Sequence, residues 1–263
     1  FTGSEGLLGV VTEATLKLLP LPPFSAALSI GFGSITAAAK GIDLIFKAGF
    51  LPSALEIADE FTLKAATQRT GSDRLSRCCG HLIVELDGQE RSVRGEIRDV
   101  KKLLTRLKPR FVDQAFGKQA VESIWQLRRE FSYSLRDTGL VKLNQDIVVP
   151  RGRLIELLEF ADRLQKKHSI PVACFGHAGD GNIHVNVMLD DAKSGRMKFR
   201  NAALDELFRW VVKSGGVITG EHGIGIARKP WWPLATSPEV RKLHRSVKQA
   251  LDPKRILNPG KFL

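Results

Sequence analysis

Cysteine is scarce in this sequence of 263 residues, which holds only three. Cys78 and Cys79 are adjacent and Cys174 stands alone, so the chain supplies neither a disulfide framework nor a full set of thiolates for an iron–sulfur cluster. Any iron–sulfur relay that works with this chain therefore lies in a partner chain. Because free thiols are typical of reducing compartments, we expect a cytoplasmic protein.

Long apolar runs are absent as well, and no stretch approaches the roughly 20 apolar residues that cross a bilayer. The first residues, Phe1-Thr-Gly-Ser4, show neither an initiator Met nor the charged and apolar regions of a signal peptide. We therefore expect residues 1–22 to be the end of a preceding domain. The proline-rich connector 19–24 separates them from a second domain over residues 23–263.

Acidic residues are outnumbered: 28 Asp and Glu stand against 40 Lys and Arg, for a net charge of +12. Such a surplus fits nucleic acid, an anionic membrane surface, an acidic partner or an anionic substrate. The cations are spread along the chain without an RNA-binding aromatic signature or zinc-finger spacing, so we expect no nucleic-acid binding. Peripheral association with the inner membrane, an electron-accepting partner and a homodimer stay open.

Strand-like and helix-like stretches alternate along the chain. We predict a buried strand over residues 9–19 and further strands over residues 25–31, 53–59, 81–86, 142–149, 172–175, 183–189 and 216–219. We predict helices over residues 35–47, 60–68, 89–107, 118–135, 153–168, 194–213 and 238–250. This alternation, with no glycine-rich phosphate loop and no internal repeat, favours an α+β sheet covered by helices.

The most informative stretch is Cys174-Phe-Gly-His-Ala-Gly-Asp-Gly-Asn-Ile-His-Val-Asn186. Its central glycines and Asn/Asp residues tolerate the positive φ of tight turns, so the chain reverses there and brings His177 beside His184. Alternation along the second strand places His184 and Asn186 on one face and the apolar residues on the other. Two imidazoles and a carboxamide then share a polar face next to an apolar core.

A second stretch, Gly215-Gly-Val-Ile-Thr-Gly-Glu-His-Gly-Ile-Gly225, places Glu221 and His222 between glycines. Glu221 could complete a His–His–carboxylate metal set with His222 left free as a base. Three ligands leave coordination positions open for substrate, which is the catalytic arrangement. Zinc, manganese and iron all suit these donors. The spacing is not that of the helical His-Glu-x-x-His motif, so a zinc protease is disfavoured.

Each of these residues also has a plainer interpretation. A single His in a strand is usually a satisfied core or surface residue, and Gly-Asp-Gly-Asn is a common turn. Arg128, on an otherwise apolar helix face, is more often a paired or snorkelling side chain, and Lys142 carries a weaker signal still. A non-catalytic binding or assembly module that keeps the fold without a cofactor is therefore the alternative to an enzyme.

Four motifs occur in order along the chain: Thr2-Gly-Ser-Glu-Gly-Leu-Leu-Gly-Val-Val-Thr12, Gly176-His-Ala-Gly-Asp-Gly-Asn-Ile-His184, Gly220-Glu-His-Gly-Ile-Gly225 and Leu257-Asn-Pro-Gly-Lys261. Together they resemble the FAD-linked oxidase C-terminal region of the vanillyl-alcohol-oxidase-type flavoproteins, the group of D-lactate dehydrogenases, glycolate oxidase FAD subunits and D-2-hydroxyglutarate dehydrogenases. The resemblance implies a ferredoxin-like cap domain with an antiparallel sheet covered by helices. The last strand of a PCMH-type FAD-binding domain would precede it.

The implied activity is oxidation of a small D-2-hydroxy acid, such as D-lactate or glycolate, to the 2-keto acid, with hydride passing to FAD. The resemblance implies a divalent metal on His177, His184 and Glu221, and a base at His222. It implies substrate contacts for Arg128, Asn186 and, with the family lysine aligning near residues 143–144, Lys142. It implies FAD contacts for Ser4, Glu5, Gly6, Gly9, Val10 and Asn258. Because the domain that holds the FAD pyrophosphate is missing, we expect the chain alone to be inactive.

Overall fold

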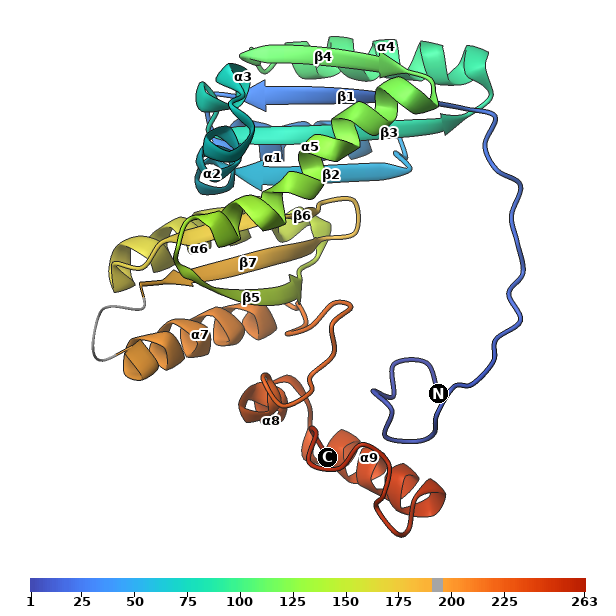
Figure 1. Cartoon of the computed structure of the whole chain (residues 1–263), viewed down its shortest axis with the longest axis vertical. Coiled ribbons are helices and arrows are strands. Elements are labelled where there is room, and N and C mark those ends of the chain that lie inside the picture. Colours follow the sequence, from blue (N-terminus) through green and yellow to red (C-terminus); the bar gives the residue numbers. More distant parts are fainter. Residues whose placement is uncertain (191–195) are drawn as a thin grey trace.

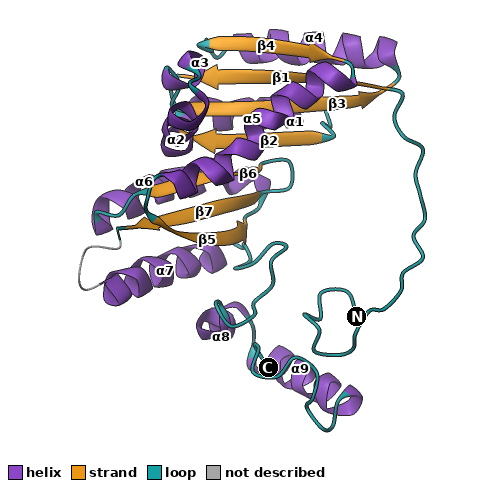
Figure 2. Ribbon diagram, viewed as in Figure 1, coloured by secondary structure: helices purple, strands orange, loops and turns teal. Residues whose placement is uncertain are grey.

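The computed structural model describes residues 1–190 and 196–263, so the predicted helix start at Ser194 lies outside the described residues. The described residues build one sheet of seven antiparallel strands in the order β4-β1-β3-β2-β6-β7-β5 (Figures 1 and 2). The strands are β1 (Phe24–Phe32), β2 (Ala54–Asp59), β3 (Gly80–Gly88), β4 (Phe111–Phe116), β5 (Val141–Val148), β6 (Val172–His177) and β7 (Asn182–Leu189). The predicted α+β class is confirmed.

The longer helices follow the apolar periodicity closely. They are α1 (Ile35–Lys47), α2 (Glu60–Thr70), α4 (Glu90–Thr105), α5 (Lys118–Asp137), α6 (Leu154–His168), α7 (Arg196–Lys213) and α9 (Pro238–Leu251). The short helices α3 (Asp73–Ser76) and α8 (Trp232–Ala235) and the 3₁₀ turns Arg151–Arg153 and Lys229–Trp231 were not predicted. Helix α1 begins where Ser34 Oγ accepts a hydrogen bond from Ala37 N–H at 3.1 Å, which satisfies an otherwise unpaired donor.

The sheet is assembled from two ferredoxin-like halves that meet at β2 and β6. In the first half, β1-α1-β2-β3-α4-β4 gives the order β4-β1-β3-β2, with α2 and α3 inserted before β3. In the second half, β5-α6-β6-β7-α7 repeats this path, and the expected fourth strand is reduced to a single bridge between Val148 and Val217. The halves thus share a topology although no repeat is visible in the sequence.

The strand predicted over residues 216–219 is therefore wrong. Only Val217 pairs with the sheet, and Gly216 lies so close to it that an added Cβ would come within 2.4 Å of the Val148 carbonyl oxygen. The Gly220 N–H lies 3.0 Å from the Asp146 backbone carbonyl oxygen and 2.9 Å from the Asp146 carboxylate, and the N–H groups of Glu221 and His222 bind that carboxylate. From Glu221 onward a side chain therefore takes the place of the backbone partner that a strand would need.

The two faces of the sheet differ in character. Helices α1, α4, α6 and α7 cover one face and bury the main apolar core, which includes Ile30, Leu82, Ile183 and Leu207. On the other face, α2 and α5 pack over a smaller cluster around Phe131, and Figure 1 shows α5 crossing in front of the strands. Beside this smaller cluster the strands present polar side chains, as the alternation in β7 predicted.

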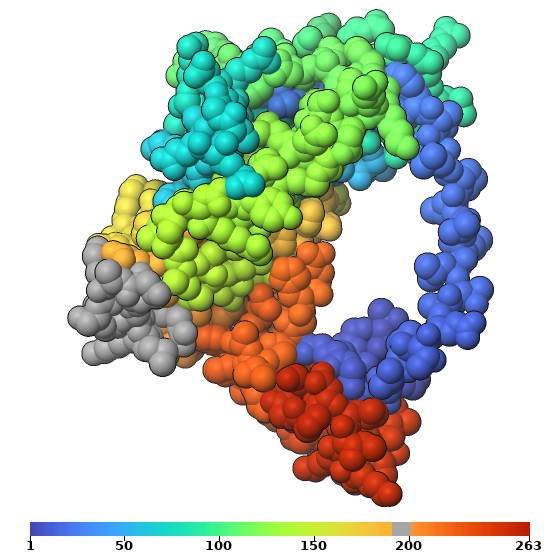
Figure 3. Space-filling model, viewed as in Figure 1, coloured from blue at the N-terminus to red at the C-terminus, as the bar shows by residue number. Residues whose placement is uncertain are grey.

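The N-terminal segment does not form the buried strand predicted over residues 9–19. Residues 10–23 have no strand pairing and are exposed, and Leu18 keeps 84% of its surface accessible. A strand needs a neighbour that takes up its N–H and C=O groups, and no described strand of this chain pairs with the segment. Figure 3 shows it standing clear of the sheet.

The first residues return to the chain at its C-terminal end. Leu7 is buried, and its carbonyl oxygen accepts a hydrogen bond from Lys248 Nζ at 2.7 Å. The same ammonium group binds the Asp252 carboxylate at 2.5 Å and the Leu257 carbonyl at 2.8 Å. The N-terminal turn is thereby tied to α9 and to the segment after it. No helix among the described residues has the length and apolarity to cross a membrane.

His81 makes the stability of the sheet depend on pH. It is fully buried in β3, where Ser29 Oγ lies 2.8 Å from Nε2, and burial lowers its pKa to about 4. Since the unfolded imidazole titrates near 6.5, the stabilisation is present above that pH and is lost as the pH falls toward 4. When the pH is lowered from 7 to 5, the unfolding free energy of the parent is expected to fall by about 2 kcal/mol more than that of His81→Asn. Urea unfolding at both pH values measures this, and equal losses in parent and variant would contradict it.

Candidate functional site

Four neighbouring strands deliver the polar residues of the site to one face of the sheet. Residues opposite one another across an antiparallel ladder point to the same face. The register pairs Glu56 of β2 with His177 of β6, and Asp146 of β5 with His184 of β7. The hairpin predicted between β6 and β7 is present, and it brings the His177 and His184 rings to a centroid separation of 5.6 Å.

The predicted metal ligands lie together. His177, His184 and Glu221 each offer one ligand atom, and these atoms lie within 4.8 Å of one another. Glu221 comes from the loop that follows α7, so the cluster joins two strands and a distant loop. A second set, Asp146, His184 and His222, meets the same criterion and shares His184 with the first.

The chemistry of His184 fits a divalent ion. Its Nδ1 is buried and has no hydrogen-bond partner among the described residues. Burial first, and the nearby charge of His177 second, lower the pKa of His184 to about 4, which leaves a neutral ring. A neutral imidazole with an available lone pair is the form that binds metal ions. Together with a carboxylate and a second imidazole, it makes a donor set suited to zinc, manganese or iron.

Glu56 was missed in the sequence, and it binds two of the predicted site residues, Arg128 and His177. Its carboxylate is 2.5 Å from Nε of Arg128 and 2.5 Å from Nδ1 of His177, and its side chain is 5% exposed. Burial raises the pKa of Glu56, but the His177 hydrogen bond and the Arg128 charge outweigh it and the pKa is lowered. Because Nδ1 of His177 is engaged, Nε2 is left for a ligand. A glutamate inside an apolar strand was the signal that could have revealed it.

Arg128 is paired, as the plainer interpretation of its helix face expected. It reaches from α5 to Glu56, and its guanidinium carbon lies 4.8 Å from the centroid of the Phe175 ring. The hydrogen bond to Glu56 uses Nε. The side chain is 12% exposed, beside the imidazole cluster. The structure therefore places Arg128 at the site with a structural partner already bound.

Asn186 and Lys142 lie farther along the same face. Asn186 is buried, and its Nδ2 donates to the carbonyl oxygens of Ala173 at 3.1 Å and His184 at 3.0 Å. Its Oδ1, like that of Asn144 across the ladder, has no partner among the described residues. Lys142 Nζ donates to Ser132 Oγ on α5 at 2.8 Å. Burial, with Arg136 nearby, lowers the Lys142 pKa.

The loop that carries Glu221 and His222 is held against the cluster. The His222 ring stacks on the His184 ring with centroids 5.6 Å apart, and its Nε2 lies 3.4 Å from Glu221 Oε1. Asp146, also missed in the sequence, accepts backbone N–H groups of this loop. Burial raises the pKa of Asp146, but hydrogen bonds from Asn182 and from the loop outweigh it and bring the pKa to about 2.

The residues predicted to contact FAD are brought together by the fold. All six line one open depression of about 600 Å³ between the N-terminal turn and the C-terminal segment: Ser4, Glu5, Gly6, Gly9, Val10 and Asn258. Asn258 Nδ2 donates to the Glu5 carbonyl oxygen, which links the two segments. The Glu5 carboxylate binds backbone N–H groups of Ile224 and Gly225. The turn is thus joined to the loop of Glu221 and His222.

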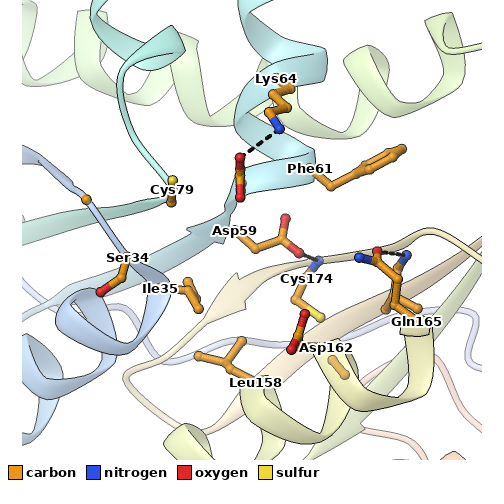
Figure 4. Close-up of a pocket in the computed structure, with 14 residues that line it drawn as sticks. Ser34, Ile35, Asp59, Phe61, Lys64, Cys79, Leu158, Asp162, Gln165 and Cys174 are labelled. Carbon is orange, nitrogen blue, oxygen red and sulfur yellow. Dashed lines mark hydrogen bonds and ion pairs between the residues drawn. The ribbon is translucent and has the colours of Figure 1, made fainter. Parts of the chain in front are cut away.

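A different cavity, of about 430 Å³, lies between the starts of α1 and α2, helix α6 and strand β6 (Figure 4). Asp59 accepts hydrogen bonds there from Thr62 N–H at 2.9 Å and Cys174 N–H at 2.6 Å, and Lys64 pairs with Glu60. The bond from Thr62 to Asp59 caps α2, and the bond from Cys174 to Asp59 connects β2 to β6 beyond their ladder. None of the predicted site residues lines this cavity.

The fold and the motifs are those of the C-terminal domain of FAD-linked oxidases. The family model described as "FAD linked oxidases, C-terminal domain" matches residues 21–262, and the chain belongs to this family. It is 30% identical over 262 residues to glycolate oxidase subunit GlcD of Bacillus subtilis, covering all of this chain and 56% of that protein. It is 33% identical over 264 residues to GlcD of Escherichia coli strain K12, covering 99% and 52%.

A D-lactate dehydrogenase of Anaerostipes hadrus is 27% identical over 268 residues, covering 99% of this chain and 56% of that protein. The chain thus spans about half the length of the curated relatives it matches. Among solved structures, p-cresol methylhydroxylase with substrate bound is 17% identical with a TM-score of 0.65, covering 93% of this chain and 53% of that one. Alkyldihydroxyacetonephosphate synthase is 18% identical with a TM-score of 0.64, covering 98% and 48%. These structures share the fold.

Proposed function

We propose that this chain is the substrate-binding and proton-accepting part of an FAD-dependent dehydrogenase that oxidises a small D-2-hydroxy acid, such as D-lactate or glycolate, to the 2-keto acid. The observation that carries the proposal is the approach of His177, His184 and Glu221 to within 4.8 Å, with His222 stacked beside them. When bound, FAD supplies the electron acceptor, and a divalent ion on these ligands supplies a Lewis acid that lowers the pKa of the substrate hydroxyl.

His222 is the group proposed to accept the hydroxyl proton. Its ring is half-exposed and lies next to Glu221 and His184, so a hydroxyl presented at the ligand cluster falls within its reach. An imidazole suits this role because one ring nitrogen carries a lone pair that can take up a proton. The backbone bond to Asp146 fixes the residue without using its ring.

The substrate carboxylate is proposed to meet Arg128, with Asn186 and Lys142 lining the same face. Nε of Arg128 donates to Glu56, and the guanidinium has further N–H donors that suit a carboxylate. The net charge of +12 attracts an anionic substrate toward the site. The amide of Asn186 and the ammonium of Lys142 offer further polar contacts.

The depression lined by the N-terminal turn and Asn258 is proposed to hold one edge of FAD. The exposed apolar side chains of residues 10–21, among them Val10, Leu16 and Leu18, are proposed to pair with a preceding flavin-binding domain. Under this proposal residues 1–22 complete that domain and residues 23–263 form the cap. A cytoplasmic location, contact with the inner membrane surface, a homodimer and an iron–sulfur or other electron-accepting partner are compatible extensions.

The decisive experiment uses a polypeptide in which this chain follows a flavin-binding domain. Anaerobic mixing with D-lactate, glycolate and D-2-hydroxyglutarate, monitored by bleaching of the flavin absorbance, is expected to reveal reduction by at least one acid. Metal analysis is expected to find a divalent ion that is lost in His184→Ala. The isolated chain is expected to be colourless and inactive. A flavin that stays oxidised with every acid, in metal-loaded protein, would favour the non-catalytic module instead.

A further inference from the structure

Two carboxylates, Glu5 near the N-terminus and Asp146 in β5, hold the loop that carries Glu221 and His222. Asp146 Oδ2 accepts the backbone N–H groups of Gly220 at 2.9 Å, Glu221 at 2.8 Å and His222 at 2.8 Å. Glu5 Oε1 accepts the N–H of Ile224 at 2.6 Å, and Oε2 accepts that of Gly225 at 2.8 Å. Five N–H groups within six residues are therefore bound to two side chains, and that of Gly220 is shared with the Asp146 backbone carbonyl at 3.0 Å.

The loop needs such anchors because its own sequence favours no regular structure. Its glycines carry the largest conformational entropy of any residue, and Gly223 and Gly225 adopt φ of +79° and +54°. The bridge at Val217 is the last sheet pairing before the loop in the described structure. Without external partners, the side chains of Glu221 and His222 would sample many positions relative to the imidazoles on the strands.

The glycines also make room for the two carboxylates. A Cβ on Gly220 would lie 3.0 Å from Asp146 Oδ1 and 2.3 Å from Asn182 Nδ2, and a Cβ on Gly223 would lie 2.7 Å from Glu5 Oε1. The spacing of glycines around Glu221 and His222 is thus explained by close approach of the anchors. This connects a motif in the loop to two acidic residues far away in the sequence.

Each anchor is itself fixed. Asp146 is fully buried, and its other oxygen accepts Asn182 Nδ2 at 2.7 Å. The backbone of Glu5 is held by Asn258, whose Nδ2 donates to the Glu5 carbonyl oxygen. Arg228 closes the far end of the loop by donating from Nη1 to the Gly223 carbonyl at 2.9 Å. A hydrogen bond to an ionised carboxylate is about twice as strong as a neutral one, so these contacts restrain the loop effectively.

We propose that Asp146 and Glu5 are positioning residues that set where Glu221 and His222 stand relative to His177 and His184. Asp146 fixes the part of the loop from Gly220 to His222, next to the sheet, and Glu5 fixes the part that follows. The roles of Glu221 and His222 rest on the proposed function, whereas the restraint of the loop does not. Because Glu5 belongs to the N-terminal turn, the turn and the loop are held as one unit.

Hydrogen exchange of the loop amides tests the restraint directly. In the parent chain, the amides of residues 220–222, 224 and 225 are expected to exchange slowly although they lie in an irregular loop. Asp146→Asn is expected to speed exchange at residues 220–222 at least about tenfold, because the amide NH2 that replaces an oxygen faces other donors. Glu5→Gln is expected to act at residues 224 and 225 and to leave residues 220–222 slow.

A matched control separates local restraint from general loss of stability. Asp59 also accepts two backbone N–H groups while buried, but those belong to α2 and β6. Asp59→Asn is expected to lower stability and to leave exchange in the loop unchanged. Should Asp146→Asn not fold, Glu5→Gln on the partly exposed N-terminal turn still tests the proposal. Equal acceleration of the loop by Asp59→Asn, or fast loop exchange in the parent, would overturn it.

Cobalt binding provides the second measurement. Titration of the chain with Co²⁺, monitored by its visible absorption, reports both affinity and coordination. Asp146→Asn is expected to weaken Co²⁺ binding about 10- to 100-fold and to alter the spectrum, as loss of a supporting partner does at other metal sites. Unchanged affinity and spectrum in Asp146→Asn would overturn the positioning role. Slow loop exchange in a parent chain that binds no Co²⁺ would instead leave the restraint standing and count against the proposed function.

Discussion

Replacing His222 with glutamine is expected to lower the rate of flavin reduction by a 2-hydroxy acid about 10³-fold, because a general base contributes between about 10² and 10⁴. Glutamine keeps the approximate size and a hydrogen-bonding end but cannot take up a proton. The His222 backbone N–H remains bound to Asp146, so the change is confined to the side chain. Substrate affinity, FAD content and metal content are expected to change little.

Anaerobic stopped-flow measurement of flavin absorbance in the two-domain polypeptide is the appropriate assay. His244→Gln is the matched control, since His244 lies on α9 with Nδ1 bonded to the Val240 carbonyl at 2.7 Å. The control is expected to reduce flavin at the parental rate. If His222→Gln does the same with saturating substrate, His222 is not the base.

Replacing Glu56 with glutamine is expected to affect both stability and metal binding. The substitution removes the negative charge that Arg128 and His177 share. The Arg128 side chain is nearly buried, so little solvent remains to stabilise its positive charge. Breaking a buried ion pair from one side costs about 3 kcal/mol or more of unfolding free energy. Glutamine keeps one acceptor oxygen for two donors, Arg128 Nε and His177 Nδ1, and carries no charge, so weaker support of His177 is expected to weaken metal binding about 10- to 100-fold.

Glu85→Gln is the control for this change. Glu85 is also a strand glutamate, but it is only partly buried and its partner is the Trp125 indole N–H rather than a cation. We expect it to leave metal affinity unchanged. Since the pKa of Glu56 is lowered, its stabilisation is present above the unfolded value of 4.5 and is lost as the pH falls below it. A Glu56→Gln protein that binds metal as tightly as the parent would rule out the coupling.

Much of the fold could be predicted because its local signals agree with its packing. Helix α1 was predicted to the residue, and in the structure Ser34 caps its first turn. The alternation in β7 placed His184 and Asn186 correctly opposite the core. Strand β4 was missed because it lies at the edge of the sheet and mixes Asp113 and Gln114 with apolar residues.

The errors share one physical origin, which is dependence on a distant partner. Residues 9–19 have a strand-like composition but lack a neighbour in the described chain. Residues 216–219 keep a single bridge to the sheet, and the loop after them binds a side chain of β5. Glu56 and Asp146 were missed for the same reason. A lone acid in an apolar strand gives no indication of which residues will lie opposite it, and that register is set only when the sheet assembles.

The site lies across the boundary between the two halves of the sheet, so it also links them. Strands β2 and β6 meet over three residue pairs, the first of which is Glu56 with His177. The imidazoles belong to one half, Glu56 to the other, and Arg128 to the helix that connects them. Loss of the pairing between β2 and β6 would separate the Glu56 carboxylate from the His177 imidazole while each half kept its own strand pairing. The polar cluster thus links the two halves of the sheet, and an intact cluster indicates that the halves are in contact.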